Sequence, residues 1–593
     1  MSRVELERAG DVAVLWLDPA GDSVNTLSAG LLARFSELLG ELEQDEAVKA
    51  AVIASRSPRG FLAGANVHEF LDYASVDEVQ AVVREGHALL ARLEGGTKPV
   101  VAAVHGACMG GGLELALACR AIVASDHPST RFAFPEVRLG LLPGLGGTQR
   151  LPARVGLPTA LDMALTGRSL YARRARRVGL VDVTVPREAV LEGAIAAARG
   201  LAAGSWRRPK VKRRTRDALL ASAAARPLVW RSARGQVARS SGGHYPAPER
   251  IVRAMRIGVE RGRAAGLEAE AQAFAELLFT PEARALIHLF FAQSNARKNP
   301  FAGRAEAHDV GTLGVVGAGL MGAGIAQVSA QAGLKVLLKD REHELAARGK
   351  GSVYRGLSRR LGRGLTAFER DRAAERVALV DDDRAFGAAQ LTIEAVLEDL
   401  ELKREVLRAV EAQAPEGHVF ASNTSAIPIA RLAEAASHPE AVLGMHYFSP
   451  VPRMPLLEVI QTDATAEWAL ATSVAVGLRQ GKTVITVRDG PGFYTTRVLS
   501  RYMAEAMTCL REGANVTLVD GAMRAYGFPQ GPFALLDDVG IDVGAKIHAV
   551  LEVLFAERGM PSDDALKRLV AAGYVGRKGG KGFYRYPSGR RGR

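Results

Sequence analysis

The chain has 593 residues, of which 48% are hydrophobic and 24% charged, and its formal net charge is +13. This length predicts roughly three or four domains rather than one core. The composition is that of a globular protein, which excludes general disorder. Three cysteines without a CxxC pair argue against a disulfide framework and against a metal site.

The sequence carries no membrane signal. No run approaches the roughly 18 apolar residues that a membrane-spanning helix needs. The first residues, from Met1 to Arg8, lack the apolar core of a secretion signal. We therefore expect no transmembrane segment and a cytoplasmic location.

The positive charge allows two interpretations: arginines on a solvated surface, or attraction to a polyanion such as nucleic acid, an anionic membrane or a phosphate-bearing substrate. The most basic stretch, residues 207–214, has no interleaved aromatic residues and no recognisable binding motif. A solvated surface is therefore the favoured interpretation, and we predict no nucleic-acid partner.

Residues 1–190 alternate short apolar runs with helical patterns, as α/β domains do. Strands are predicted at 12–17, 50–54 and 99–104. Glycine clusters follow at 110–112 and 144–147. This segment is predicted to be the first domain.

The first glycine cluster is predicted to lie where a strand meets a helix, so that free N–H groups and the helix dipole can stabilise a negative oxygen. Two nearby carboxylates, Glu114 and Glu136, could then perform acid–base chemistry. Glu114 could equally be a first-turn glutamate that stabilises its own helix. The sequence leaves this alternative open.

Residues 191–308 lose the strand signals and read as long helices rich in Ala, Arg and Glu, which predicts a helical extension and linker. A second α/β unit is predicted over 309–491, beginning with a strand at 312–316. Residues 492–593 are predicted to form a mostly helical domain. The expected fold class is therefore α/β and multidomain.

A GxGxxG pattern follows the strand at 312–316, with Gly317, Gly319 and Gly322 ahead of an Ala-rich helix. In this setting the glycines permit a tight turn, a close approach of the backbone to a pyrophosphate, and packing of the helix on the strand. Asp340 ends the next predicted strand, where it can accept hydrogen bonds from a ribose and repel a 2′-phosphate. The pattern predicts NAD rather than NADP, although neighbouring Lys339 weakens that preference, and the alternative is a glycine-rich turn without a ligand.

His446 and Glu458 are separated by a proline-rich stretch that allows a turn between two short extended segments. A histidine can take the hydroxyl proton when an alcohol is oxidised, and a carboxylate on its other nitrogen would fix the tautomer. Taken alone, such a pair is more often a structural hydrogen bond.

The motifs GAGLMGAGIAQ, ASNTS (421–425), HYFSPVPRMPLLEV (446–459) and DGPGFYTTR (489–497) resemble the 3-hydroxyacyl-CoA dehydrogenase family. The resemblance implies a Rossmann NAD-binding domain, an all-α C-terminal domain, and His446 as the general base with Glu458 as its partner. Ser425 would contact the substrate hydroxyl and the cofactor, and Thr496 the substrate. The other residues implied to line NAD are Met321, Asp340, Val396, Leu397, Glu398, Lys403 and Ser449. Ser449 and Thr496 stand where stand-alone members usually carry Asn.

The N-terminal motifs FLAGAN (61–66), HGACMGGGLE (105–114), FPE (134–136) and GLLPGLGGTQR (140–150) resemble the crotonase family. The resemblance implies a ββα-spiral core, with the N–H groups of Ala65 and Gly111 as the oxyanion hole and Glu114 and Glu136 as the catalytic pair. Both glutamates are present, which favours hydration over other crotonase chemistry. Asn66 replaces the usual Asp, with little expected effect.

In this order, the motifs resemble the α subunits of fatty-acid oxidation complexes. That resemblance implies hydration of trans-2-enoyl-CoA to (S)-3-hydroxyacyl-CoA and its oxidation with NAD to 3-ketoacyl-CoA, with acyl-CoA thioesters and a thiolase β subunit as partners. Arginines at 173, 174, 176 and 177 could guide the CoA phosphates. Family members usually continue with a second copy of the helical domain, whereas this sequence ends at Arg593, which bears on dehydrogenase output and thiolase assembly.

Two other functions are compatible with the sequence. One is a hydratase or isomerase whose dehydrogenase half binds NAD without activity, and substrate-dependent NADH formation separates it from the first interpretation. The other is a basic scaffold for nucleic acid or anionic membrane, which would bind with steep salt dependence and ignore changes at Glu114 and Glu136.

Overall fold

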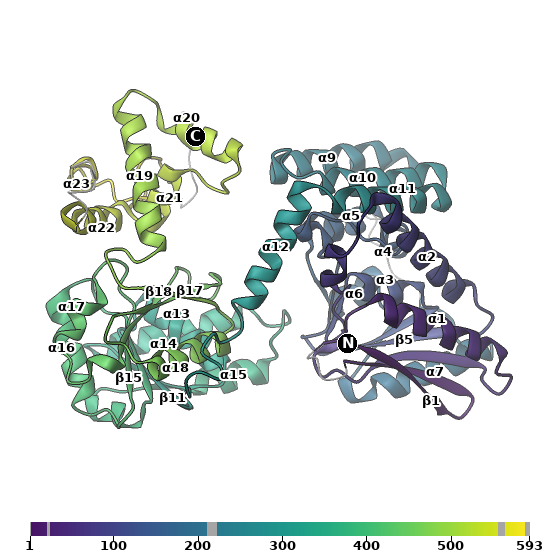
Figure 1. The fold of residues 1–593 in the computed structure, drawn as a ribbon, viewed down its shortest axis with the longest axis horizontal. Coiled ribbons are helices and arrows are strands. Elements are labelled where there is room, and N and C mark those ends of the chain that lie inside the picture. The colour runs from purple at the N-terminus through teal and green to yellow at the C-terminus, as the bar shows by residue number, and fades with distance from the viewer. Residues whose placement is uncertain (1, 20–23, 210–221, 555–563, 588–593) are drawn as a thin grey trace. The chain divides into compact units, whose positions relative to one another are not determined.

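The computed structural model describes residues 2–19, 24–209, 222–554 and 564–587. Most of the basic stretch at 207–214 therefore lies outside the described residues. The chain forms two compact units: Met1–Phe291 with Gly362–Thr366, and Ala292–Leu361 with Ala367–Arg593 (Figure 1). In the described part of the chain no helix is both long and apolar enough to cross a membrane.

The first unit is built on two sheets. The six-stranded sheet has the order β1-β2-β3-β5-β7-β10, and only β1 and β2 pair antiparallel. Its strands are β1 (Arg3–Ala9), β2 (Val12–Asp18), β3 (Ala50–Ser55), β5 (Val100–Val104), β7 (Ala121–Ser125) and β10 (Val183–Val185). The smaller sheet contains β4 (Gly60–Leu62), β6 (Ala107–Met109), β8 (Arg131–Ala133) and β9 (Leu170–Tyr171). The strands predicted near 12, 50 and 100 are confirmed.

A ββα unit repeats along this part of the chain. Strands β3, β5 and β7 enter the large sheet, and each is followed by a strand of the small sheet and then by a helix. The helices of this region are α1 (Ala29–Gln44), α2 (Val76–Gly95), α3 (Gly111–Ala118), α4 (Gly147–Val155), α5 (Leu157–Thr166), α6 (Ala172–Val178) and α7 (Val190–Ala202). The repeat brings the ends of β4, β6 and β8 together beside the N-terminus of α3.

The central strands β3, β5 and β7 of the large sheet are buried on both faces, which explains why they are apolar at nearly every position. In β3, Ala51 and Ile53 face the main core, whereas Ala50 and Val52 face α7. This alternation follows from the two-residue period of a strand. A strand covered on both sides must be apolar on both sides.

Helices from the predicted extension pack on the same main core. They are α9 (Arg226–Ser241), α10 (Ala247–Arg261) and α11 (Arg263–Leu278), and Figure 1 shows them stacked against one another beside α4 and α5. Trp230, Met255 and Phe274 contribute side chains that are buried in that core. The helix α12 (Pro281–Asn295) follows. No strand lies between β10 and β11 among the residues described there, as the sequence predicts.

The second unit contains an eight-stranded sheet of order β13-β12-β11-β14-β15-β16-β17-β18, in which only β16 and β17 pair antiparallel. Its strands are β11 (Thr312–Val316), β12 (Lys335–Lys339), β13 (Val377–Leu379), β14 (Leu391–Glu394), β15 (Val419–Ser422), β16 (Val442–Tyr447), β17 (Leu456–Gln461) and β18 (Thr483–Arg488). The order places β11 between β12 and β14, and the glycine-rich loop follows β11 at this interior position.

The helices that accompany this sheet are α13 (Leu320–Gln331), α14 (His343–Ser358), α15 (Ala367–Glu375), α16 (Leu400–Glu411), α17 (Ile429–Ala433) and α18 (Glu467–Arg479). A helical segment follows, with α19 (Thr495–Arg511), α20 (Val516–Tyr526), α21 (Pro532–Val539), α22 (Ile541–Leu554) and α23 (Ala565–Ala571). It has its own small core, which includes Met507, Phe533 and Leu566. The predicted helical character after residue 492 is confirmed.

Two candidate active sites

The first candidate site forms where β6 leads into α3. Gly110 connects them with φ 52°, a conformation that favours glycine. A Cβ at Gly110 would lie 2.8 Å from Oε1 of Glu136 and 3.4 Å from Cα of Gly64. Three segments that are distant in sequence therefore meet here, and the carboxyl group of Glu136 lies directly against the turn.

Glu114 lies in the first turn of α3 and is only 2% exposed. Its Oε1 accepts hydrogen bonds from the backbone N–H groups of Leu145 and Gly147, each 2.7 Å away. Burial, together with the nearby negative charges of Glu270 and Glu136, raises the pKa of Glu114 well above its usual range. Because the carboxylate contacts the loop before α4, it acts on a different segment from its own helix.

Glu136 begins a short 3₁₀ helix, Glu136–Leu139, which follows β8. Its Oε2 is buried and has no hydrogen-bond partner among the described residues. Burial, with a contribution from the charge of Glu270, raises the pKa of Glu136 to about 8. A carboxyl group in this environment can hold a proton near neutral pH.

The predicted oxyanion donors flank this pair of carboxyl groups. Leu27 donates to the carbonyl of Gly64 and accepts from the N–H of Asn66, so the N–H of the intervening Ala65 points away from Leu27. The N–H of Gly111 lies at the start of α3, where no intrahelical acceptor exists. Neither N–H has a hydrogen-bond partner in the described parts of the chain, so both are free to bind an oxygen.

A third buried carboxylate, Glu270 of α11, supports this site and was not anticipated from the sequence. It is fully buried and accepts hydrogen bonds from the N–H groups of Gly146 (2.5 Å) and Thr148 (3.0 Å). It also accepts from the Thr148 hydroxyl and contacts Nε2 of His87 at 2.9 Å. Glu270 thus holds the loop whose amides hold Glu114. The sequence offered one indication of this role: a charged residue at position 270 within an apolar helical pattern.

The second candidate site lies on β16 and β17. His446 and Glu458 are direct partners in the antiparallel register, and Nδ1 of His446 lies 2.7 Å from Oε2 of Glu458. Both side chains are buried, and the His446 ring lies 4.5 Å from the ring of Phe448. With Nδ1 occupied by the carboxylate, Nε2 is the nitrogen left to exchange a proton.

Glu458 is held from a second side by Thr495, at the start of α19. The Thr495 N–H donates to Oε1 at 2.9 Å and its hydroxyl to Oε2 at 2.8 Å. Burial acts to raise the pKa of Glu458, but the hydrogen bonds from His446 and Thr495 outweigh it and the pKa is lowered. Glu458 therefore stays ionised. Thr495 was not singled out from the sequence, although it precedes Thr496, which was.

The glycine-rich loop has the shape that a dinucleotide requires. A Cβ at Gly317 (φ 97°) would lie 2.6 Å from the Ala395 carbonyl, and one at Gly322 would lie 1.7 Å from the Gly317 carbonyl. At Gly319, by contrast, no atom lies within 4 Å of the Cβ position. Open space at the N-terminus of α13 fits a pyrophosphate that hydrogen-bonds to the backbone there.

Asp340 lies at the end of β12, beside this loop. Its Oδ2 accepts from the Ala318 N–H at 2.7 Å and its Oδ1 from the Arg341 N–H at 2.8 Å. Each carboxylate oxygen retains a lone pair that can face a ribose. Lys339 forms an ion pair with Asp383, so its charge is neutralised and counts less against NAD than the sequence suggests.

Several of the other predicted NAD residues lie in the loops after β14 and β15 or in α16, the helix that follows the first of these loops. Lys403 is buried and binds Glu394 at 2.8 Å, while Glu398 accepts from the Thr424 hydroxyl (2.6 Å) and the Ser425 N–H (3.1 Å). Leu397 is 74% exposed. The other predicted NAD residues are Met321 (half-buried), Val396 (half-buried, its N–H donating to Glu394) and Ser449 (exposed). Thr496, predicted to contact the substrate, is half-buried.

Three family models match the chain in sequence. They are "Enoyl-CoA hydratase/isomerase" over residues 8–227, "3-hydroxyacyl-CoA dehydrogenase, NAD binding domain" over 312–490, and "3-hydroxyacyl-CoA dehydrogenase, C-terminal domain" over 492–586. The chain thus combines a hydratase-type domain with an NAD-dependent dehydrogenase, and the expected crotonase and Rossmann architecture is confirmed.

Two curated relatives align with almost the whole chain. The fatty acid oxidation complex subunit alpha of Shewanella amazonensis is 42% identical over 98% of this chain and 82% of its own length. That of Shewanella loihica is 42% identical over 97% of this chain and 81% of its own. Among solved structures, (S)-3-hydroxybutyryl-CoA dehydrogenase from Ralstonia eutropha is 35% identical with a TM-score of 0.46, covering 47% of this chain and all of the other. The chain belongs to the family of fatty acid oxidation complex α subunits, bifunctional enzymes of β-oxidation.

Proposed function

We propose that the Glu114–Glu136 site hydrates trans-2-enoyl-CoA and that the His446–Glu458 site oxidises the resulting (S)-3-hydroxyacyl-CoA. The observation that carries this proposal is the presence of both catalytic constellations in one chain. Glu114 in the first and the His446–Glu458 pair in the second are buried and oriented by hydrogen bonds. Acyl-CoA thioesters fit the chemistry of both sites.

In the hydratase site, the N–H groups of Ala65 and Gly111 would bind the thioester oxygen as it becomes an enolate. Glu114 takes a proton from water as the water attacks C3. Burial raises its pKa, but the amides of Leu145 and Gly147 on Oε1 favour the ionised form that this role requires. Glu136, whose buried Oε2 has no partner, delivers its proton to C2. Protonation at C2 converts the enolate back to the thioester. Glu114 then carries the proton from water, and transfer of one proton from Glu114 to Glu136 restores the starting state.

In the dehydrogenase site, Nε2 of His446 accepts the proton of the C3 hydroxyl. Glu458 holds Nδ1 and stabilises the imidazolium that results. The glycine-rich loop would hold NAD⁺, which would supply the hydride acceptor for C3. Ser425 and Thr496 would orient the hydroxyl and the thioester, and Gly317, Gly319, Gly322 and Asp340 would hold the dinucleotide.

We further propose that the chain works in the cytoplasm with a thiolase β subunit. The support is the "subunit alpha" in the names of its relatives and the product of the second site, a 3-ketoacyl-CoA, which is what a thiolase cleaves. Co-purification with such a subunit, followed by CoA-dependent cleavage of the 3-ketoacyl-CoA, tests this part.

The test of the two activities is a coupled assay with crotonyl-CoA, a medium-chain enoyl-CoA and NAD⁺, in which enoyl loss and NADH formation are followed together. We expect both signals, with His446→Ala removing NADH formation and Glu136→Gln removing enoyl loss. Enoyl loss without NADH in the unmodified protein would contradict the dehydrogenase half and leave a hydratase.

A further inference from the structure

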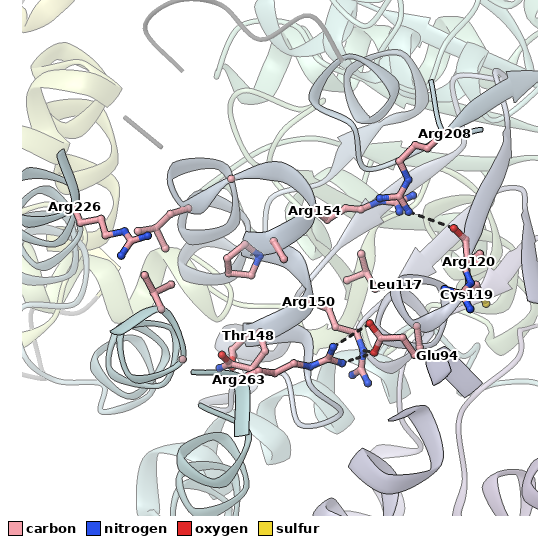
Figure 2. Close-up of a pocket in the computed structure, with 18 residues that line it drawn as sticks. Glu94, Leu117, Cys119, Arg120, Thr148, Arg150, Arg154, Arg208, Arg226 and Arg263 are labelled. Carbon is pink, nitrogen blue, oxygen red and sulfur yellow. Dashed lines mark hydrogen bonds and ion pairs between the residues drawn. The ribbon is translucent and has the colours of Figure 1, made fainter. Parts of the chain in front are cut away.

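A cavity of about 620 Å³ lies in the first unit, away from the hydratase carboxylates. It is lined by residues of α3, α4, α5, α10 and α11 and of the segments near 208 and 226, and neither Glu114 nor Glu136 lines it. Figure 2 shows that arginine side chains dominate its wall. There are six of them: Arg120, Arg150, Arg154, Arg208, Arg226 and Arg263.

Carboxylates neutralise only part of this charge. Glu94, which also lines the cavity, binds Nε of Arg150 at 3.1 Å and Nη1 of Arg263 at 3.0 Å. Asp182, behind the wall, pairs with Arg154 and with Nε of Arg208 at 3.0 Å. Two carboxylates therefore serve four arginines.

The other two arginines, Arg120 and Arg226, have no ion-pair or hydrogen-bond partner for their guanidinium groups within the described residues. They lie toward opposite sides of the view in Figure 2. In addition, the Arg150 side chain is only 3% exposed, and its Nη2 has no hydrogen-bond acceptor among the described residues. A buried unpaired donor on a cation is costly, because nothing replaces the water that it has lost.

The wall thus offers more cationic donors than the described protein groups can satisfy. A concave surface of one charge concentrates its field on whatever enters it. Guanidinium groups bind phosphate oxygens with paired hydrogen bonds, and a volume of this size suits a small organic ligand. A chain of phosphates presents more anionic oxygens to these arginines than a single phosphate does.

We propose that this cavity is a binding site for a polyphosphate anion of nucleotide size, separate from both active sites. The ligand chemistry has two possible sources: the phosphates of a CoA thioester or a free adenine nucleotide. The site is linked to the hydratase through one residue, Leu145: Nη1 of Arg150 donates to the Leu145 carbonyl at 2.7 Å, and the Leu145 N–H donates to Glu114.

The test is binding of tripolyphosphate to the full chain by isothermal titration at low salt. The double variant Arg120→Glu, Arg226→Glu reverses the two unpartnered charges, and Arg234→Glu is the matched control. Arg234 is exposed on α9, the helix that carries Arg226, and does not line the cavity. Because neither Arg120 nor Arg226 has a partner to lose, we expect unchanged thermal unfolding in all variants.

We expect tripolyphosphate affinity to fall at least about tenfold in the double variant and to change less than about twofold in the control. CoA, 3′-dephospho-CoA and ADP then identify the source. A loss confined to CoA points to thioester phosphates, and an equal loss for ADP points to free nucleotides. The proposal is overturned if the double variant binds tripolyphosphate as the wild type does, or if the control loses as much.

Discussion

At the scale of single residues, the titration of the Glu136 carboxyl group has a clear consequence for how stability depends on pH. Its folded-state pKa of about 8 lies above the ordinary value of 4.5, so the folded protein keeps a proton that the unfolded chain loses. The stability associated with that proton is complete below about pH 4.5 and is lost as the pH rises through about 8. In the proposed mechanism, hydration delivers this same proton to C2.

Glu136→Gln should therefore separate catalysis from stability. We expect hydration to fall by about 10²–10⁴-fold, because the proton donor is gone. From pH 5 to pH 9 the wild type should lose roughly 1–3 kcal/mol more unfolding free energy than the variant does, because an amide cannot ionise. Urea unfolding at the two pH values measures this, with NADH formation from 3-hydroxyacyl-CoA as the control. An unchanged pH dependence would contradict the raised pKa.

At this scale, some partners were predictable and others were not. The sequence indicated the His446–Glu458 pair, because Pro450 and Pro452 between them allow a turn that returns the chain. It could not indicate the amide donors of Glu114, more than thirty residues away at Leu145 and Gly147, since loop amides carry no side-chain signature. Glu270 comes from a helix with no local motif, and only the packing of α11 on the core reveals its contacts.

At the scale of elements, the glycines of the loop between β11 and α13 have two different roles: two of them are required by packing, and one leaves space for a ligand. A Cβ at Gly317 or Gly322 collides with backbone, whereas a Cβ at Gly319 projects into open space. These three positions share a motif but predict different consequences on substitution.

Gly319→Ala should leave the fold intact and weaken NAD binding. The added methyl group meets no protein atom, and the backbone of Gly319 has φ −66°, which alanine adopts freely. We expect a rise in the dissociation constant for NAD⁺ of about tenfold or more, because the methyl group occupies space that a pyrophosphate needs. Thermal unfolding and hydratase activity of the same variant are internal controls. Unaltered NAD⁺ affinity would show that the dinucleotide lies elsewhere.

Helix α11 is the element that joins the predicted extension to the hydratase chemistry. Glu270 of this helix accepts hydrogen bonds from both sides of Gly147, whose own N–H binds Glu114. The sequence predicted the helices of this region. It could not predict their place, because apolar helix faces specify burial without specifying a partner.

Glu270→Gln and Glu270→Ala should form a graded pair. Glutamine keeps one oxygen acceptor for the loop amides, so we expect kcat for hydration to fall about tenfold with little change in KM. Alanine leaves the amides of Gly146 and Thr148 buried without acceptors and should also destabilise the unit by about 3 kcal/mol. Steady-state hydratase kinetics and urea unfolding distinguish these effects. Equal kcat in all three proteins would remove the positioning role.

For the whole molecule, the two compact units place the two chemistries on separate cores. Each unit has its own hydrophobic cluster, so a substitution in one active site should leave the activity of the other unchanged. The order of family matches along the sequence anticipates this division. The assignment of α9, α10 and α11 to the first core is visible only from their buried side chains.

A mixture of two single-site variants tests this independence. Neither Glu136→Gln nor His446→Ala alone should convert enoyl-CoA and NAD⁺ to NADH, but together they should do so. NADH should appear after a lag, since the 3-hydroxyacyl-CoA must leave one chain and reach another. Stopped-flow absorbance follows both signals. A mixture that stays inactive, while each variant retains its remaining activity, would mean that the intermediate is not released.

The antiparallel pairing of β16 with β17 has a consequence for how the dehydrogenase is inactivated by heat. His446 and Glu458 face each other through strand register, and β17 is also paired with β18 on its far side. A slip of one residue would turn the two side chains to opposite faces, so the His446–Glu458 pair depends on the register between β16 and β17. Amide hydrogens here should be among the slowest of this unit to exchange with deuterium. Heat inactivation of the dehydrogenase should then follow the opening of the whole sheet.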